Sequence, residues 1–272
     1  MRKWILSAVV LALCCLAWAC AQNDGSEAEA ATEAEEQAVY QTFADLAGKT
    51  IATHSGGTFD SMIEAQIKNP VIVYYDDLID QADALRGGVI DAIAVDQPVA
   101  FVFVGENPDL RILDDPLADD AYVFAAKKDS DLTATANEVI DRLQADGTLT
   151  EIAARWLGTD PAVKKLPAAE EEGTDGVLRY GCDVSSEPMC YKDDEGNVLG
   201  MDIEIVTHIA QALNMKLEIY PMTFASMLEA LETGEVDMIG GCLSETAQRQ
   251  ARYDLTTPYY QGGVAVIVKG ED

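Results

Sequence analysis

The segment 49–96 alternates between short apolar runs and stretches with helical spacing. Three runs have the length and β-branched composition of buried strands: 49–54, 71–75 and 89–95. Two stretches have apolar residues three and four positions apart, as amphipathic helices do: 59–68 and 77–86. Strands that alternate with helices are typical of a parallel sheet, so we expect an α/β fold here.

The chain after residue 120 repeats this rhythm. The strand candidates are 121–126, 177–181, 216–220, 236–240 and 264–268. The helix candidates are 137–143, 149–157, 202–213, 224–231 and 246–252. The pattern predicts a second α/β unit.

The first twenty residues differ from the rest. Arg2 and Lys3 precede an uncharged apolar run, and small residues flank Trp18 just before Cys20. This is the layout of a secretory signal, and Cys20 resembles the lipidated residue of bacterial lipoproteins. We expect cleavage before Cys20 and lipid on it. The alternative is an uncleaved anchor helix, for which the run is short.

Two polar stretches divide the chain. Residues 21–42 are acidic and low in complexity, which predicts a flexible tether, and 161–176 is a proline-containing acidic linker. The predicted organisation begins with a signal peptide (1–20) and the tether (21–42). A lobe (43–120), completed by a strand at 264–268, comes next and is followed by a crossover with helices (121–160) and the linker (161–176). The helices of 121–160 pack on a second lobe (177–260), and a hinge strand (261–272) returns to the lobe at 43–120.

Charge and cysteine usage narrow the function classes. The formal net charge is −30, which argues against nucleic acid and anionic lipid as partners; solubility alone is a sufficient reason for it. After signal removal the cysteines are Cys182, Cys190 and Cys242, and their spacing lacks the paired pattern of a zinc site. We expect no metal and no cofactor.

Four groups of residues carry a resemblance to a known family. They are Leu199 to Glu204 (LGMDIE); Val236-Asp237 with Ser244 to Arg249 (SETAQR) and Thr257 to Tyr260 (TPYY); Asp45 to Thr50 with Ser55 to Thr58 (SGGT) and Gly87 to Asp96; and Asp146 to Thr148 with Arg155 to Gly158 (RWLG). Together they resemble the polar-amino-acid solute-binding proteins of ABC importers, the bacterial extracellular solute-binding proteins of family 3. The resemblance spans nearly all of the chain after the tether.

The order of the halves departs from this family, which runs the counterpart of 177–269 first and that of 43–158 second. The last residues, from Val264 onward, would continue smoothly into Phe43 if the ends were joined. We interpret the chain as a circular permutation within one monomer. The resemblance implies two α/β lobes of the type II periplasmic-binding fold, joined by crossings near 258–264 and 119–126.

The resemblance also implies a function. We expect a receptor without covalent chemistry that is lipid-anchored in the cell envelope, binds an L-amino acid between its lobes and delivers it to an ABC permease in the membrane. Two alternatives stay open: a dehydratase of cyclic carboxylates with Glu187 or Glu245 as its acid, and a sensing module for a membrane signalling protein.

A cation is expected to hold the ligand carboxylate. Arg249 follows Thr246 by three residues at the start of a short helix, which Thr246 can cap. A guanidinium there can make two parallel hydrogen bonds to a carboxylate, and helix N–H groups add to them. Spacing alone also fits a surface salt bridge. The resemblance favours the ligand role and adds Ser244.

The other lobe supplies a glycine-rich turn and an acid. Ser55-Gly56-Gly57-Thr58 can present N–H groups to an anion, although a plain tight turn is the alternative. By the resemblance, Thr58, Gly57 and Ser55 meet the carboxylate. Asp96 ends a buried strand, where open α/β sheets bind ligands, and is expected to pair with the α-ammonium; the alternative is a helix cap.

By the resemblance, the ligand side chain is expected to meet Phe224 and His54; His54 could equally be a satisfied strand-end histidine. Asp183 lies at the matching strand end of the other lobe and is a candidate for the ligand ammonium or side chain. Cys242 stands where relatives carry Ser or Gly beside the carboxylate, and Ser186 where they usually carry a stacking aromatic. Without that aromatic, a polar or modest-sized side chain is preferred over a bulky cationic one.

One disulfide is also predicted. Cys182 closes a strand and Cys190 lies in the loop after it, so the two can meet across a turn in an oxidising compartment. A bridge between Cys190 and Cys242 is the alternative.

Overall fold

The computed structural model describes residues 39–167 and 173–270. The predicted signal peptide, the lipidation site Cys20 and the tether up to residue 38 lie outside the described residues, as does the middle of the linker. No helix in the described part of the chain is long and apolar enough to cross a membrane.

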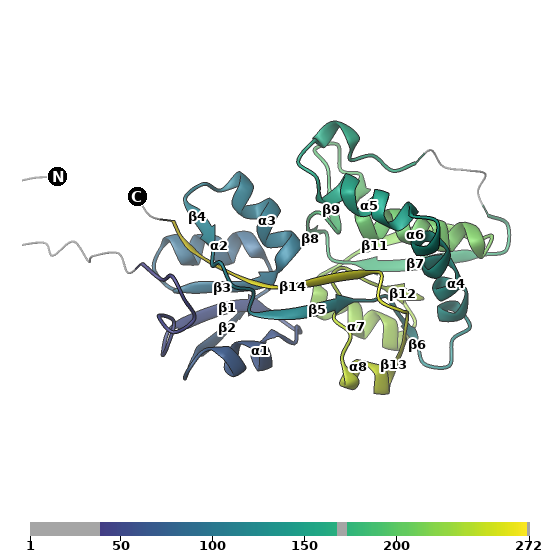
Figure 1. Ribbon diagram of the computed structural model, residues 1–272. Helices are drawn as coiled ribbons and strands as arrows, with labels where there is room; N and C mark the ends of the chain where they lie inside the picture. The colour runs from purple at the N-terminus through teal and green to yellow at the C-terminus, as the bar shows by residue number, and fades with distance from the viewer. Residues whose placement is uncertain (1–38, 168–172, 271–272) are drawn as a thin grey trace, which may run out of the picture. The chain divides into compact units, whose positions relative to one another are not determined.

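The first sheet combines strands from both ends of the chain. Its strands are β1 (Thr50–His54), β2 (Val71–Tyr75), β3 (Ala92–Asp96), β4 (Leu110–Ile112), β5 (Ala118–Tyr122) and β14 (Tyr260–Lys269). The order is β2-β1-β3-β14-β4, and β5 also pairs with β14. The first three strands are parallel, and β14 runs antiparallel to β3, β4 and β5. Figure 1 shows β14, in yellow, beside β5.

Helices cover both faces of this sheet. They are α1 (Phe59–Gln66), α2 (Leu78–Arg86) and α3 (Gln97–Glu106). Alternate residues of β3 point to opposite faces: Ala94 packs in a cluster with Ile63 of α1, and Ile93 packs in another with Leu85 of α2. Every residue of β3 is therefore buried, as its continuous apolar sequence predicts.

The second sheet has the order β11-β7-β12-β6-β13. Its strands are β6 (Ala125–Lys127), β7 (Val177–Cys182), β11 (Lys216–Pro221), β12 (Met238–Ile239) and β13 (Tyr253–Leu255). The helices of this part are α4 (Leu132–Ala145), α5 (Thr148–Leu157), α6 (Met201–Ala212), α7 (Phe224–Thr233), α8 (Ala247–Arg252) and the short 3-10 turn η1 (Pro161–Val163). A small sheet of β8 (Ser185–Ser186), β9 (Cys190–Lys192) and β10 (Val198–Leu199) lies before α6.

A buried carboxylate joins α5 to α6. Glu204 accepts hydrogen bonds at 2.6 Å from the Arg155 guanidinium and at 2.6 Å from the Trp156 indole. Trp156 is fully buried, and Tyr191 of β9 meets its ring edge-on. The two helices are thus held together by a charge-assisted contact as well as by apolar packing.

The chain passes between the two sheets twice, from β5 to β6 and from β13 to β14. Aromatic pairs lie at these passes: the rings of Tyr122 and Tyr260 stack 5.7 Å apart, and those of Phe124 and Tyr259 stack 4.4 Å apart. The pass at 123–124 lies in the segment expected for one crossing (119–126), and the pass at 256–259 overlaps the segment expected for the other (258–264). The predicted α/β fold with two lobes is confirmed.

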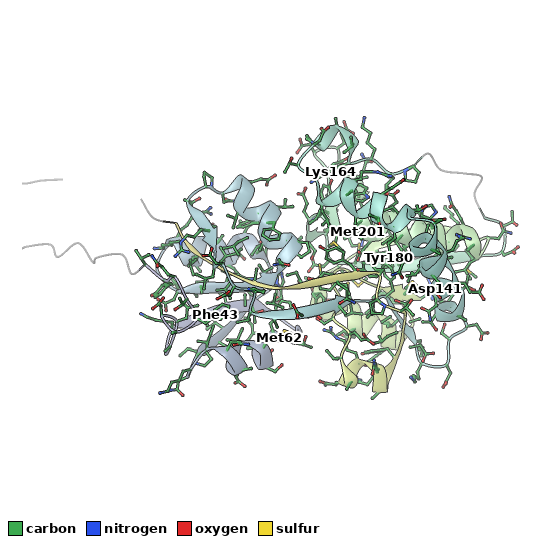
Figure 2. The ribbon with its side chains drawn as sticks, viewed as in Figure 1. Phe43, Met62, Asp141, Lys164, Tyr180 and Met201 are labelled. Carbon is green, nitrogen blue, oxygen red and sulfur yellow. The ribbon has the colours of Figure 1, made fainter. Side chains whose placement is uncertain are left out.

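The ends of the described body meet in the first sheet. Arg111 of β4 donates to the Tyr40 carbonyl and pairs with Val268 of β14. Phe43 and Met62 pack against the same apolar cluster as Val268, whereas Tyr180 and Met201 belong to a second cluster that also includes Ile93 of β3 (Figure 2). In this sheet, Val264 to Ile267 of β14 pair with β3.

Candidate functional site

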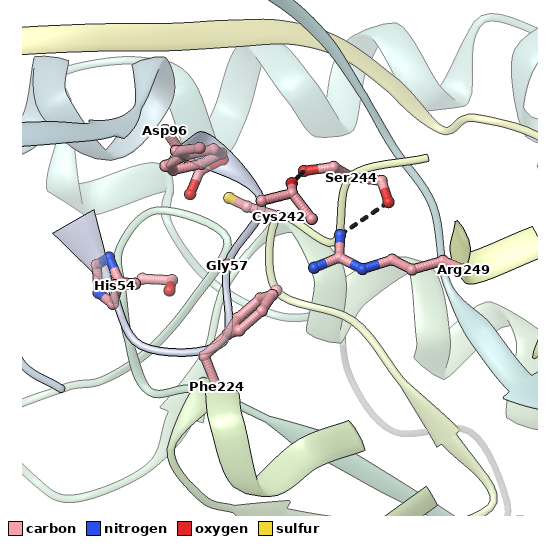
Figure 3. A pocket seen from close by; sticks show the side chains of 11 residues that line it. His54, Gly57, Asp96, Phe224, Cys242, Ser244 and Arg249 are labelled. Carbon is pink, nitrogen blue, oxygen red and sulfur yellow. Dashed lines mark hydrogen bonds between the residues drawn. The ribbon is translucent and has the colours of Figure 1, made fainter. Parts of the chain in front are cut away.

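A small pocket lies where the ends of strands from both sheets come together. The first sheet and its loops contribute His54, Gly57, Thr58, Phe59 and Asp96. The second contributes Ser186, Phe224, Gly241, Cys242, Ser244 and Arg249. Figure 3 shows these side chains converging from both sides.

Arg249 supplies the cation of the pocket. Thr246 caps α8 by accepting a hydrogen bond from the Arg249 N–H at 3.2 Å, as its spacing predicts. The guanidinium is held by the Ser244 carbonyl at 2.9 Å and lies 5.6 Å from the Phe224 ring centre (Figure 3). The residue is only 5% exposed, and burial lowers its pKa although two nearby carboxylates oppose that shift. Among the described residues it has no ion-pair partner within 4 Å.

Asp96 supplies a carboxylate on the facing side. It occupies the N-cap position of α3 but makes no side-chain capping bond. It is 8% exposed, and its Oδ1 has no hydrogen-bond partner within the described residues. Burial raises the pKa of Asp96 well above its ordinary value, although the Tyr122 hydroxyl and the charge of Arg249 lower it. A bound ammonium would restore the ionised form.

Asp120 is a second carboxylate beside the pocket that the sequence did not reveal. It is 7% exposed on β5, its Oδ1 accepts from the Ala121 N–H at 2.8 Å, and its Oδ2 is unpartnered in the described chain. Burial raises its pKa, while the Ser244 hydroxyl and Arg249 lower it. No local motif marks Asp120, because β5 comes near Arg249 only through its contact with the segment before α8, where Tyr122 bridges to Ser244 and the Glu245 N–H donates to the Ala121 carbonyl at 2.8 Å.

The glycine-rich turn closes the pocket from the first sheet. Gly56 has φ +79°, and a Cβ there would lie 3.2 Å from Ala225 Cα of α7, so the close approach requires glycine. Thr58 precedes α1 without capping it, and its hydroxyl lies 3.5 Å from that of Ser244. The two predicted carboxylate-binding segments therefore face each other across the pocket.

His54 and Phe224 also line the pocket. Burial lowers the pKa of His54, against the effect of nearby Asp183. Asp183 itself does not line the pocket: it accepts from the Phe224 N–H at 3.1 Å and from the Ser185 N–H and hydroxyl at 2.9 and 2.7 Å. Ser55 also lies outside the lining residues, and its N–H is bonded to Tyr75. Asp183 and Ser55 therefore lie next to lining residues without lining the pocket themselves.

The three cysteines of the described chain are free and buried. Cys242 lines the pocket with φ +54°, and burial raises the pKa of its thiol. The Cys190 thiol faces Cys182, which adds to burial in raising the pKa of Cys190. The bridge between Cys182 and Cys190 stays a prediction.

Most predicted site residues are thus brought together. Phe59 and Gly241 also line the pocket and were not foreseen; their neighbours Thr58 and Cys242 were. Within the described residues, a buried guanidinium without an ion-pair partner and a buried carboxylate with an unpartnered oxygen suit a zwitterion that carries both complementary charges.

Comparison with known proteins relates the chain to a family. Residues 178–272 match the bacterial extracellular solute-binding proteins, family 3. This match confirms the inferred resemblance for residues 178–272. Members of this family are extracytoplasmic binding proteins.

Three relatives illustrate the similarity. The probable amino-acid-binding protein YxeM of Bacillus subtilis is 32% identical over 98 residues, which are 36% of this chain and 37% of that protein. The L-cystine-binding protein TcyJ of Escherichia coli is 28% identical over 35% of each chain. The ABC transporter arginine-binding protein 1 of Escherichia coli is 30% identical over 43% of this chain and 51% of its own. The chain therefore spans between a third and a half of the length of these relatives.

Solved structures are also similar. The ligand-binding component of an ABC-type import system from Staphylococcus aureus gives a TM-score of 0.45 at 12% identity, over 82% of this chain and 66% of that one. The arginine-bound domain 1 of TmArgBP gives 0.31 at 27% identity, over 36% of this chain and 82% of that one. Since neither score reaches 0.5, the description of the fold rests on the strand order.

Proposed function

We propose that this protein is a receptor that binds a free L-amino acid between its two sheets. The carboxylate of the ligand pairs with Arg249 and the α-ammonium with Asp96. The observation that carries the proposal is that, within the described residues, one pocket holds a buried guanidinium without an ion-pair partner and a buried carboxylate whose Oδ1 has no hydrogen-bond partner. Burying charges without partners is costly, and a zwitterion satisfies both at once.

The receptor would serve import. The named relatives include amino-acid-binding and ABC transporter proteins, which supports delivery of the ligand to an ABC permease. We propose further that Cys20 carries lipid, so that the protein works as a monomer attached to a membrane on the extracytoplasmic side.

A polar or modest-sized ligand side chain fits the pocket best. Ser186 and His54 line it, and the Phe224 ring is already engaged by the Arg249 guanidinium at 5.6 Å. One face of Phe224 is therefore already occupied by a cation.

A thermal-shift screen of the twenty L-amino acids tests the proposal. A ligand at a hundred times its Kd adds about 2.7 kcal/mol to the free energy of unfolding, which is readily seen as a higher melting temperature. We expect one or a few amino acids to act, with their D-enantiomers as controls. No shift with any of the twenty would overturn the proposal.

The dehydratase alternative gains no support from its two candidate acids. Glu187 pairs with Lys164 at 3.5 Å and Glu245 accepts from Gln250 at 2.7 Å, and neither lines the pocket. Turnover of prephenate or arogenate by the protein would favour the dehydratase over the receptor.

We also propose that the two halves are circularly permuted. The family match lies at the end of the chain, and β14, its last strand, completes the sheet begun by β1. The Gly270 N–H donates to the Asp109 carbonyl at 2.7 Å, while Arg111 holds Tyr40, so the two ends of the body meet on one edge. Such neighbouring ends are what a permutation requires.

A further inference from the structure

A buried carboxylate outside the pocket contacts the turn that forms one of its walls. Asp202 lies in the first turn of α6 and is 0% exposed. Its Oδ2 accepts hydrogen bonds from the Gly241 N–H at 2.6 Å and from the Tyr180 hydroxyl at 3.4 Å. Within the described residues no ion pair includes Asp202. A charge buried without a cation is costly, so its main compensation is the bond to the turn.

The turn it holds has an unusual backbone. Gly241 has φ +96° and the next residue, Cys242, has φ +54°. A non-glycine residue in this region is strained unless its surroundings fix it. Both residues line the pocket, and the carbonyl of Ser244, two positions further on, holds the Arg249 guanidinium. The shape of the turn therefore sets one wall of the pocket and the place of its cation.

The surroundings of Asp202 contain hydroxyls and thiols. The facing groups are the hydroxyls of Tyr180 on β7 and Tyr259 before β14, and the thiols of Cys190 on β9 and Cys242 in the turn. Burial raises the pKa of Asp202 to about 7, although the Tyr259 hydroxyl, the Gly241 N–H and the Tyr180 hydroxyl each lower it. The carboxylate thus changes its charge near neutral pH.

We propose that Asp202 is a positioning residue for the ligand site: its ionised carboxylate holds the Gly241–Cys242 turn in the conformation that binds the ligand. The proposal rests on the proposed function, because it concerns the same pocket. Asp202 acts through the Gly241 N–H and does not touch the ligand. Protonation removes the negative charge that strengthens this bond, so ligand affinity falls as the carboxylate is neutralised.

Stability follows pH in the opposite direction. Because burial raises the folded pKa of Asp202 above its ordinary value, the folded protein favours the neutral acid. This contribution to the free energy of unfolding is full below about pH 4 and is lost as pH rises through about pH 7. The ionised form that the site requires is therefore the less stable one. Asp202→Asn keeps the shape, removes the charge and should raise the melting temperature at about pH 8.

Binding and stability can be measured together. The probe is an equimolar mixture of the twenty L-amino acids, and the readout is the melting temperature as a function of its concentration at about pH 6 and about pH 8. We expect Asp202→Asn to need roughly tenfold more of the mixture at about pH 8, and to differ less from wild type at about pH 6. Asp96, Asp120 and His54 titrate in both proteins, so the difference between the proteins isolates Asp202.

Glu204→Gln is the matched control. It removes another buried carboxylate of α6, but one that faces Arg155 and Trp156 and not the pocket. It should lower the melting temperature and leave the response to the mixture within threefold of wild type. A residue with a merely structural role at 202 would behave like this control, with lower stability and unchanged binding. That result would overturn the proposal.

A ligand-free measurement separates the proposal from the proposed function. The Gly241 amide proton, followed by nuclear magnetic resonance, should shift between about pH 6 and about pH 8 in the wild type and stay still in Asp202→Asn. If the chemical shift of the Gly241 amide proton does not change with pH in the wild type, the proposal is wrong. If the mixture stabilises neither protein while this amide still titrates, the receptor function fails but the hold of Asp202 on the turn stands.

Discussion

Arg249 is the residue on which ligand binding depends most. Removing one member of a buried, hydrogen-bonded charge pair costs about 2–5 kcal/mol, so Arg249→Ala should weaken binding roughly 30- to 4,000-fold. Calorimetric titration with the amino acid found by screening measures this. Arg252→Ala is the control, because Arg252 lies on the same helix but pairs at the surface with Glu232. An affinity of Arg249→Ala within threefold of wild type would remove Arg249 from the site.

Asp96 should decide whether the ligand needs a free α-ammonium. Asp96→Asn keeps the shape and loses the charge, so binding of the free amino acid should weaken while an N-acetylated ligand loses its disadvantage. Competition calorimetry with both ligands measures the ratio. Asp119→Asn, which changes an exposed carboxylate on β5, should leave the ratio unchanged. If the Asp96→Asn variant still rejects the acetylated ligand as strongly as wild type does, Asp96 has another role.

The two buried thiols nearest each other should form the disulfide. The Cys190 thiol faces Cys182, so we expect these two to be joined after aerobic purification. Closing a loop of about nine residues contributes roughly 2–3 kcal/mol if the bridge is unstrained. Mass spectrometry of proteolytic peptides identifies the pair. A Cys190–Cys242 peptide, or three free thiols, would refute it.

Single residues were predictable where their signal is local. Thr246 caps the helix of Arg249 as the three-residue spacing requires, and Asp96 follows from its place at the end of an apolar strand. Asp120 and Gly241 have no such signal. Asp120 reaches the site because β5 contacts the Ser244 segment. The Gly241 N–H is held by a hydrogen bond to the carboxylate of Asp202, which lies thirty-nine positions away in sequence.

At the level of elements, the joint between α5 and α6 can be tested. Arg155→Ala leaves the buried Glu204 without its counter-charge, which should lower the free energy of unfolding by about 3 kcal/mol. Urea unfolding followed by fluorescence measures the loss, because Trp156 is the only tryptophan in the described chain. Arg142→Ala, at an exposed position of α4, is the control and should change stability by less than about 0.5 kcal/mol. Equal stability of both variants would mean that the joint is held by packing alone.

The hydrophobic pattern correctly predicted amphipathic helices and strands that consist of one short apolar run. The expected strand at 71–75 coincides with β2, and the helix at 59–68 ends only two residues early, as α1. α3 was missed, because its sequence QPVAFVFVGE is apolar all round and shows no helical stripe. β14 is four residues longer at its start than expected, since Gly262 and Gly263 disguise a strand that must pass close to Tyr122 and Ala118.

For the whole molecule, reordering the chain tests the permutation. A protein in which 177–270 come first and 43–158 follow through a short linker should fold and bind the same amino acid within threefold of wild-type affinity. The reason is that Tyr40 and Val268 both contact Arg111, so the new junction spans a short gap. Calorimetry and unfolding curves measure the outcome.

A second variant is needed because the reordered chain could fail to fold only through an unsuitable linker. A chain that stops after residue 263 lacks the part of β14 between β3 and β4 and should unfold more readily in the first sheet. If the reordered chain fails to fold while this truncated chain keeps full stability, the permutation is wrong. The family match alone did not settle this point, because it covers residues 178–272 and leaves the other half unmatched.

The neighbouring ends of the body also determine how it responds to mechanical force. Both ends leave from the first sheet, and the second sheet is inserted in the chain between β5 and β14. A pull on the two ends therefore loads β14 and the strands beside it, while the second sheet lies outside the load path. In an optical trap, the first sheet should rupture before the second extends. The half that carries Arg249 would then keep its shape while the half that carries Asp96 is lost.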